Sequence, residues 1–257
     1  MKSNANERVR DFILVDDRLL DKYAEQIRDS FAEIDKKSWK MSASITGPVI
    51  ESSRTKERIP LKTHEKIDLV EAYFEANNDL LTRRPATTDE HNVEGAPRFV
   101  LETMVATKIL LPLTKTDLVK GLSNVAIWVS DPDPTLFSQQ PWDWRGTFVY
   151  LSEIHWDNKS SSNYLSGVSA LQAVVNLSRG RDFFEIIQGE FEPYGRGRDL
   201  HPIDKLQEIG GITLDKRKIK SLYRIRYFTN EQKYKYDGQE RRVNDLLGYP
   251  LYILSES

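Results

Sequence analysis

The chain has 257 residues, 39% of them hydrophobic and 30% charged, with a formal net charge of -2. This composition is typical of a soluble globular protein, and the length suits one large domain or two small ones. Cysteine is absent from the sequence, which excludes disulfides, thiolate metal sites and a cysteine nucleophile.

Two amphipathic helices are predicted in the N-terminal third. Residues 16–35 repeat apolar side chains at three- and four-residue steps, with Asp16 or Asp17 as the N-cap. Residues 63–81 show the same pattern after Thr63, a plausible cap. An apolar stripe of this kind must be buried against another element, so we expect both helices to pack on the rest of the chain.

A polar segment separates these helices from the rest of the chain. Residues 85–97, "PATTDEHNVEGAP", are rich in turn-forming residues, which predicts a linker or a mobile loop. We therefore divide the chain into an N-terminal helical part (1–84), this segment, and an α+β domain (98–257). Whether the helical part folds independently is left open by the sequence.

β-Branched and aromatic residues become frequent from residue 98 onward. The pattern predicts three successive strands at 98–112, 124–132 and 145–157, then a helix at 162–180, a strand at 182–193 and a short helix at 201–211. The fold class is therefore α+β, with N-terminal helices packed against a mostly antiparallel sheet and a basic β-hairpin at the C-terminus.

The predicted hairpin consists of strands at 221–228 and 232–242, joined through "TNE". On the first strand Tyr223, Ile225 and Tyr227 share one face, which we expect to point toward the core. The cations of the hairpin then point toward solvent: they are Arg224, Arg226, Lys233 and Lys235. The residues that follow predict a short helix or turn and a last apolar strand.

Charge is unevenly distributed along the sequence. Residues 216–242 contain ten Lys or Arg and three acidic residues, a net charge of +7 in a chain whose total is -2. A basic block on an otherwise acidic protein is the pattern of a surface that binds phosphate groups. It is also the pattern of an ordinary solvated sheet face, and the sequence leaves both interpretations open.

The segment 191–202, "FEPYGRGRDLHP", places two glycines and two arginines ahead of a helix that begins with proline. Such glycines let backbone N–H groups surround an anion, and Arg196 and Arg198 add bidentate donors. The segment matches neither the dinucleotide-binding motif nor the P-loop. We expect an anion-binding loop that includes Arg196, Arg198 and His201; the alternative is a strand-to-helix turn with surface arginines.

A second candidate site lies in "EIHWD". On a strand Glu153, His155 and Asp157 occupy alternate positions, so their side chains share one face. Two carboxylates and an imidazole side by side predict a site for a divalent metal ion. Asp143, at the entrance to the same strand, is the further acid of a candidate catalytic set with Glu153 and His155. The alternative is a polar outer face that binds no metal.

The leading functional hypothesis is a soluble binding protein for a phosphate-bearing ligand, above all nucleic acid, held by the basic hairpin and the Gly-Arg-Gly-Arg loop. One alternative is a metal-dependent phosphodiesterase or nuclease that uses Asp143, Glu153 and His155. Another is a non-catalytic subunit of a larger assembly, which would have protein partners. The sequence has no signal-peptide pattern and no membrane-length apolar run, so we expect a cytoplasmic protein without a membrane partner.

Overall fold

A computed structural model describes most of the chain. The described residues are 11–35, 60–93, 95–112, 122–138, 140, 143–156, 200–208 and 210–256. The segments predicted as a helix at 162–180 and a strand at 182–193, together with Arg196, Arg198 and Asp157, lie outside these residues.

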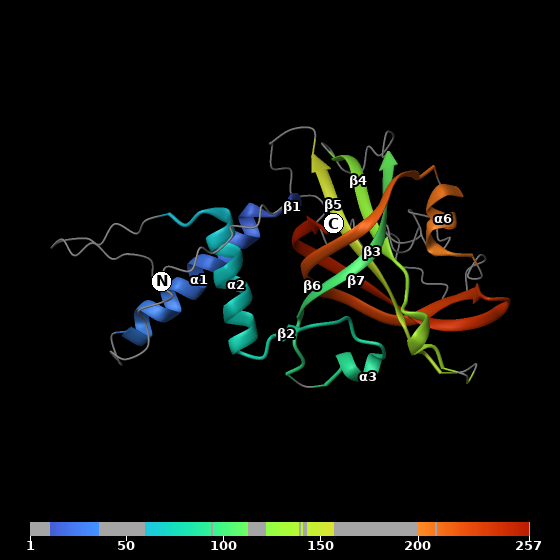
Figure 1. Cartoon of the computed structure of the whole chain (residues 1–257), viewed down its shortest axis with the longest axis horizontal. Helices are drawn as coiled ribbons and strands as arrows, with labels where there is room; N and C mark the ends of the chain where they lie inside the picture. The colour runs from blue at the N-terminus through green and yellow to red at the C-terminus, as the bar shows by residue number, and fades with distance from the viewer. Residues whose placement is uncertain are drawn as a thin grey trace, which may run out of the picture.

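Five strands form a sheet that closes on itself (Figure 1). They are β3 (Phe99–Pro112), β4 (Leu122–Ser130), β5 (Thr147–Trp156), β6 (Ile212–Tyr236) and β7 (Gln239–Ser255). β3 pairs with β4, β4 with β5, β5 with β7, β7 with β6, and β6 returns to pair with β3. Only the β5–β7 pair of this ring is parallel. The prediction of helices with a mostly antiparallel sheet is confirmed.

The connections of the ring form a Greek key. β3, β4 and β5 follow one another as antiparallel neighbours, and β6 returns to lie beside β3. Two short strands extend the sheet: β1 (Phe12–Val15) pairs with the end of β7, and β2 (Leu80–Leu81) pairs with the start of β3. The first and last strands of the described chain are therefore neighbours.

The long hairpin of the sheet differs from the predicted one. β6 continues through "TNE" to Tyr236, and the turn lies at Asp237 and Gly238, whose φ angles are 49° and 72°. Two successive residues with positive φ make a tight hairpin turn, for which Asp-Gly is a favoured sequence. β7 then runs as one strand to Ser255, so the short helix or turn expected before the last strand is wrong.

β-Bulges explain a second difference. The pairing of β6 with β7 shifts between Ile225 and Tyr227, so side chains on the two sides of the bulge change faces. Tyr223 and Ile225 are buried in one cluster, whereas Tyr227 packs against another. The expectation that all three side chains share one face is therefore wrong.

One hydrophobic cluster takes buried residues from all five ring strands, which places it inside the ring. Its largest side chains are Trp128 of β4 and Tyr223 of β6, both fully buried. Gly248 of β7 lies against Tyr223 and Leu151, and a Cβ there would come within 2.6 Å of both side chains. The interior has no room for a side chain at this position.

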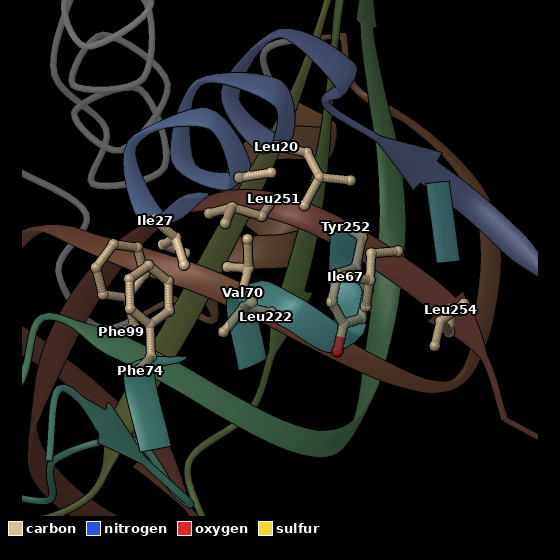
Figure 2. Packing of buried hydrophobic residues seen from close by; sticks show 11 residues of the cluster. Leu20, Ile27, Ile67, Val70, Phe74, Phe99, Leu222, Leu251, Tyr252 and Leu254 are labelled. Atoms are coloured by element: carbon tan, nitrogen blue, oxygen red, sulfur yellow. The ribbon is translucent and has the colours of Figure 1, made fainter. Parts of the chain in front are cut away.

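The helices α1 (Asp17–Asp35) and α2 (Thr63–Ala76) cover one part of the outside of the sheet. Figure 2 shows their apolar side chains directed at Leu222 of β6 and Leu251 of β7. Phe74 of α2 stacks on Phe99 of β3, with ring centroids 3.9 Å apart. The helices thus share a core with the sheet.

Both helices begin close to the predicted residues. Asp16 caps α1, since its carboxylate accepts a hydrogen bond from the Leu19 N–H at 2.9 Å. α2 begins at Thr63 but ends at Ala76, five residues earlier than predicted. Asn78 adopts a positive φ of 56°, which ends the helix and lets the chain enter β2.

The predicted linker is attached to the sheet in its first half. It contains the single-turn helix α3 (Thr88–His91), and Ala86 is buried. The Pro85 carbonyl accepts a hydrogen bond from the Thr147 hydroxyl at 2.6 Å, and the Ala86 carbonyl accepts one from the Asn244 amide at 2.8 Å. The helix α6 (Pro202–Glu208) lies on the side of the sheet away from α1 and α2, at the right of Figure 1, and packs Leu206 against the sheet.

Candidate functional site

Three lysines form a row on β6. Lys216, Lys218 and Lys220 alternate along the strand without an interruption in its register, so their side chains share one face. Consecutive lysines of the row are two positions apart in the sequence, which corresponds to about 7 Å along the strand. Lys216 and Lys218 are exposed and Lys220 is half-buried. We call these three residues the lysine row.

The lysine row lies in a window that the helices leave uncovered. Opposite Lys220 and Lys218 on β3 are Thr103 and Val105, both exposed, Val105 by 53%, whereas Thr107, opposite Lys216, is buried. On the same face of β3, Phe99 packs under α1 and α2, and Ile109 packs with α6. The helices therefore cover both ends of this face and leave the lysine row open to solvent between them.

Two acidic residues lie near the lysine row: Asp131 beside Lys216, and Glu256, whose N–H donates to the Lys218 carbonyl at 3.0 Å. Within the described parts of the chain, none of its three side chains forms an ion pair, and the nearby Asp215 is paired with Arg217. Asp131 lies close enough to Lys216 for the charges to interact. Burial alone would raise the pKa of Asp131, but the hydrogen bond from His201 and the charges of His201, Lys216 and Arg84 together lower it.

The predicted hairpin cations lie at separate places. Arg224 is half-buried opposite Phe99, and Arg226 is exposed at the bulge. Lys233 and Lys235 lie near the tip, where the Lys233 ammonium is 3.7 Å from the Glu240 carboxylate. The hairpin cations therefore do not form one continuous face with the lysine row.

His201 belongs to the start of α6. Its Nδ1 accepts a hydrogen bond from the Ile203 N–H at 3.2 Å, which leaves Nε2 to donate to the Asp131 carboxylate at 3.0 Å. Its ring packs edge-on against Phe148, near the beginning of β5. These contacts fix the helix on the sheet and occupy both ring nitrogens.

Glu153 is buried and already satisfied. The Trp128 indole N–H donates to its carboxylate at 2.5 Å, and the Lys108 ammonium lies at 2.7 Å from the other oxygen. Its side chain is 4% exposed. These two donors compensate the negative charge of the buried carboxylate, so no partner from outside the protein is needed.

The residues of the second candidate site are only partly brought together. Asp143 pairs with Arg145 before β5 begins, whereas Glu153 lies six residues inside the strand, about 20 Å from its start. His155 follows on β5 opposite Asn124, with its side chain outside the described atoms. Among the residues that the structure describes, no three acidic or histidine side chains could hold one metal ion.

We expect Glu153→Ala to lower the free energy of unfolding by about 2–4 kcal/mol, because the change leaves Lys108 and the Trp128 indole without their acceptor. Glu153→Gln, which retains an acceptor for Trp128, should cost less. Urea denaturation of the three proteins, with and without EDTA, measures both effects. A wild-type stability that falls on addition of EDTA would instead support a metal at this site.

A small cavity lies near the tip of the β6–β7 hairpin, beside the loop that precedes β5. Arg241 and Arg242 of β7 line it together with Phe137 and Arg145 of the loop. Arg241 and Arg242 were not among the predicted ligand-binding residues. The Asp-Gly dipeptide could have indicated this position, because it fixes the turn and hence the register of the two strands.

Comparisons with protein-family models, with curated proteins and with solved structures found no match to this chain. No helix in the described ranges is both long and apolar enough to cross a membrane.

Proposed function

We propose that the protein binds nucleic acid, and that the lysine row holds the phosphates of the backbone. The observation that carries the proposal is the open window on β6, where Lys216, Lys218 and Lys220 lie between α6 and the pair α1 and α2 and form no ion pair with the described residues. Phosphate contacts supply most of the affinity of sequence-independent nucleic-acid binding.

The spacing of the lysine row favours an extended single strand. Side chains that repeat every two residues follow a straight line with steps of about 7 Å, comparable to the separation of consecutive phosphates in an extended strand. The exposed side chains of Thr103 and Val105 run alongside. They offer small polar and apolar contacts to the sugars or bases.

The arrangement of the five ring strands resembles that of a known nucleic-acid-binding fold. A five-stranded Greek-key sheet that closes on itself is also the plan of the OB-fold, which binds oligonucleotides and oligosaccharides. A fold alone does not determine function, so the lysine row remains the basis of the proposal. Arg196 and Arg198 of the Gly-Arg-Gly-Arg loop precede α6 and would add phosphate contacts, as would Arg224 and Arg226.

The alternatives from the sequence have less support. A phosphodiesterase would need Asp143 and Glu153 near one another, but they lie toward opposite ends of β5, and Glu153 is held by Lys108 and Trp128. A role as a subunit of an assembly would use apolar surface. Ile212 and Leu214, each about half exposed at the start of β6, are candidates for such a contact.

A salt titration tests the proposal. We expect a fluorescently labelled single strand to bind the protein with a log–log salt slope of about -2 or steeper, because three phosphate contacts each release counterions. Binding should then weaken about 15-fold or more between 50 and 200 mM salt. Fluorescence anisotropy with single-stranded and duplex DNA and RNA measures this slope. Absence of binding at low salt would disprove the proposal.

A further inference from the structure

The end of β7 brings an acidic residue beside the lysine row. Ser255 of β7 lies opposite Ile219 of β6, and the N–H of the next residue, Glu256, donates to the Lys218 carbonyl at 3.0 Å. Residues opposite one another in an antiparallel pair project from the same face of the sheet, and their Cα atoms are about 5.5 Å apart when the pair is hydrogen-bonded. Glu256 therefore lies on the face of the lysine row, directly beside Lys218.

Lys218 consequently has different neighbours on its two sides. Val105 of β3, 53% exposed, lies opposite it on one side, and Glu256, which is half-buried, lies opposite it on the other. An apolar, a cationic and an anionic side chain thus stand next to one another on three adjacent strands. A nucleotide whose phosphate is held by Lys218 would lie over all three.

Glu256 differs from Asp131, the other acidic residue near the lysine row. The Asp131 carboxylate accepts a hydrogen bond from His201 at 3.0 Å and so helps to attach the start of α6 to the sheet. Glu256 joins the sheet through its backbone N–H, so the pairing of β6 with β7 does not require its carboxylate. The negative charge of Glu256 can therefore be explained by what it does at the lysine row.

A carboxylate at this position has two effects on a bound nucleotide. It repels the phosphate: two unit charges about 6 Å apart in water interact strongly enough to lower the affinity about threefold. It also offers about four acceptor positions, so it can accept a hydrogen bond from a ligand even where a cation lies beside it. A ligand gains from Glu256 only if it presents an N–H donor close to its phosphate.

The bases of nucleic acids differ in this property. Cytosine and adenine carry an exocyclic amino group, and cytosine N4 is a donor to Glu and Asp side chains. Thymine has the O4 carbonyl at the corresponding position, as does uracil, and a carbonyl oxygen is repelled by a carboxylate. The charge of Glu256 therefore favours bases with an amino group and disfavours thymine and uracil.

We propose that Glu256 determines which bases the lysine row accepts, and that the protein prefers single strands whose bases carry an amino group, cytosine above all. The inference rests on the proposed function, since the phosphate beside Lys218 is taken to belong to a nucleic acid. The lysine row supplies affinity for every strand, and the acidic residue beside it supplies a preference among strands.

The test compares labelled 12-nucleotide strands of deoxycytidine and of thymidine by fluorescence anisotropy, at about 50 mM salt and a mildly alkaline pH that keeps cytosine uncharged. We expect the wild type to bind the deoxycytidine strand about three- to tenfold more tightly. Glu256→Ala removes both the repulsion and the acceptor, so affinity for the thymidine strand should rise about threefold and the preference should be lost. Glu256→Gln, which keeps a carbonyl acceptor without the charge, should retain part of the preference.

The ratio of the two affinities is the quantity to compare, because changes in net charge or in the fraction of folded protein affect both strands alike. Glu25→Ala, at an exposed position on α1, removes the same charge and should leave this ratio unchanged. An equal change for both strands in Glu256→Ala would show that the carboxylate acts through its charge alone; this result would overturn the inference and leave the proposed function intact. Absence of binding to either strand by the wild type would overturn both.

Discussion

Replacing Arg84 with alanine is expected to lower the free energy of unfolding by about 3–5 kcal/mol, the cost of leaving a buried ion-pair partner alone. The Arg84 guanidinium contacts both carboxylate oxygens of Glu102 at 3.1 Å, and the two side chains are only 11% and 9% exposed. Arg84 also donates to the carbonyl of Thr147 and to the hydroxyl of Ser130. One side chain thereby connects β3, β4 and β5.

Glu102 depends on Arg84 for a further reason. The Tyr223 hydroxyl donates to the Glu102 carboxylate at 2.5 Å, inside the ring of strands. Burial, followed by the Glu102 charge, raises the pKa of Tyr223 well above its usual value, so the tyrosine stays protonated and remains a donor. In the alanine variant the carboxylate would retain two neutral donors, the tyrosine hydroxyl and the backbone N–H of residue 84 at 3.4 Å, and would lose the guanidinium charge.

The control for this experiment is the adjacent residue. Arg83 is 60% exposed and lies 3.5 Å from Glu90, so Arg83→Ala should change stability by about 1 kcal/mol or less. Urea denaturation followed by circular dichroism measures both variants. Equal losses for the two substitutions would show that the contacts of Arg84 add nothing beyond those of a surface arginine.

Replacing the lysine row with alanine is expected to abolish most nucleic-acid affinity at low salt. Three phosphate contacts on a single strand contribute on the order of 10²–10³-fold to affinity at 50 mM salt relative to 1 M salt. Lys216→Ala with Lys218→Ala and Lys220→Ala should remove this factor and flatten the salt slope by about 2. Anisotropy titrations of the triple variant at several salt concentrations measure both changes.

A second triple variant controls for net charge. Lys22, Arg83 and Arg98 are exposed on α1 and in the segment before β3, away from the lysine row. Their replacement with alanine removes the same three charges and should change affinity only a few-fold through the long-range field. If both triple variants lose the same affinity, the binding depends on net charge, and the lysine row is not a site.

Local periodicity was sufficient to predict most elements of this fold. The three- and four-residue repeat of 16–35 identified α1, because Leu20 and Ile27 are the residues that it buries. Runs of β-branched and aromatic residues identified β3, β4 and β5, of which β4 and β5 are buried on both faces in their middle portions. In these elements the buried positions follow directly from the periodicity of a short stretch of sequence.

Features that depend on distant residues were not predicted. Closure of the sheet requires β6 to pair with β3, more than one hundred residues earlier, and no local pattern encodes that choice. The bulge between Ile225 and Tyr227 changes the face of Tyr227, although the sequence alternates regularly there. The true hairpin turn was missed because "TNE" interrupts the alternation more visibly than Asp237-Gly238 does.

The same limit applies to the candidate sites. Alternation suggested a metal site or a polar outer face for Glu153, but the residue is buried, and its partners Lys108 and Trp128 come from two other strands. The basic composition of 216–242 was evident, whereas the open window around Lys218 depends on where α1, α2 and α6 pack. Whether a charged residue is paired or free is a property of the tertiary structure.

The position of β7 determines the order in which the molecule can form. This strand supplies a partner for β1, β5 and β6, and it follows all of them in the sequence. Until it is in place, β1 has no strand to pair with, β5 pairs with β4 alone, and the ring of strands cannot close. Contacts of such long sequence separation form slowly, so the apolar strands must be kept from aggregating until β7 has paired with them.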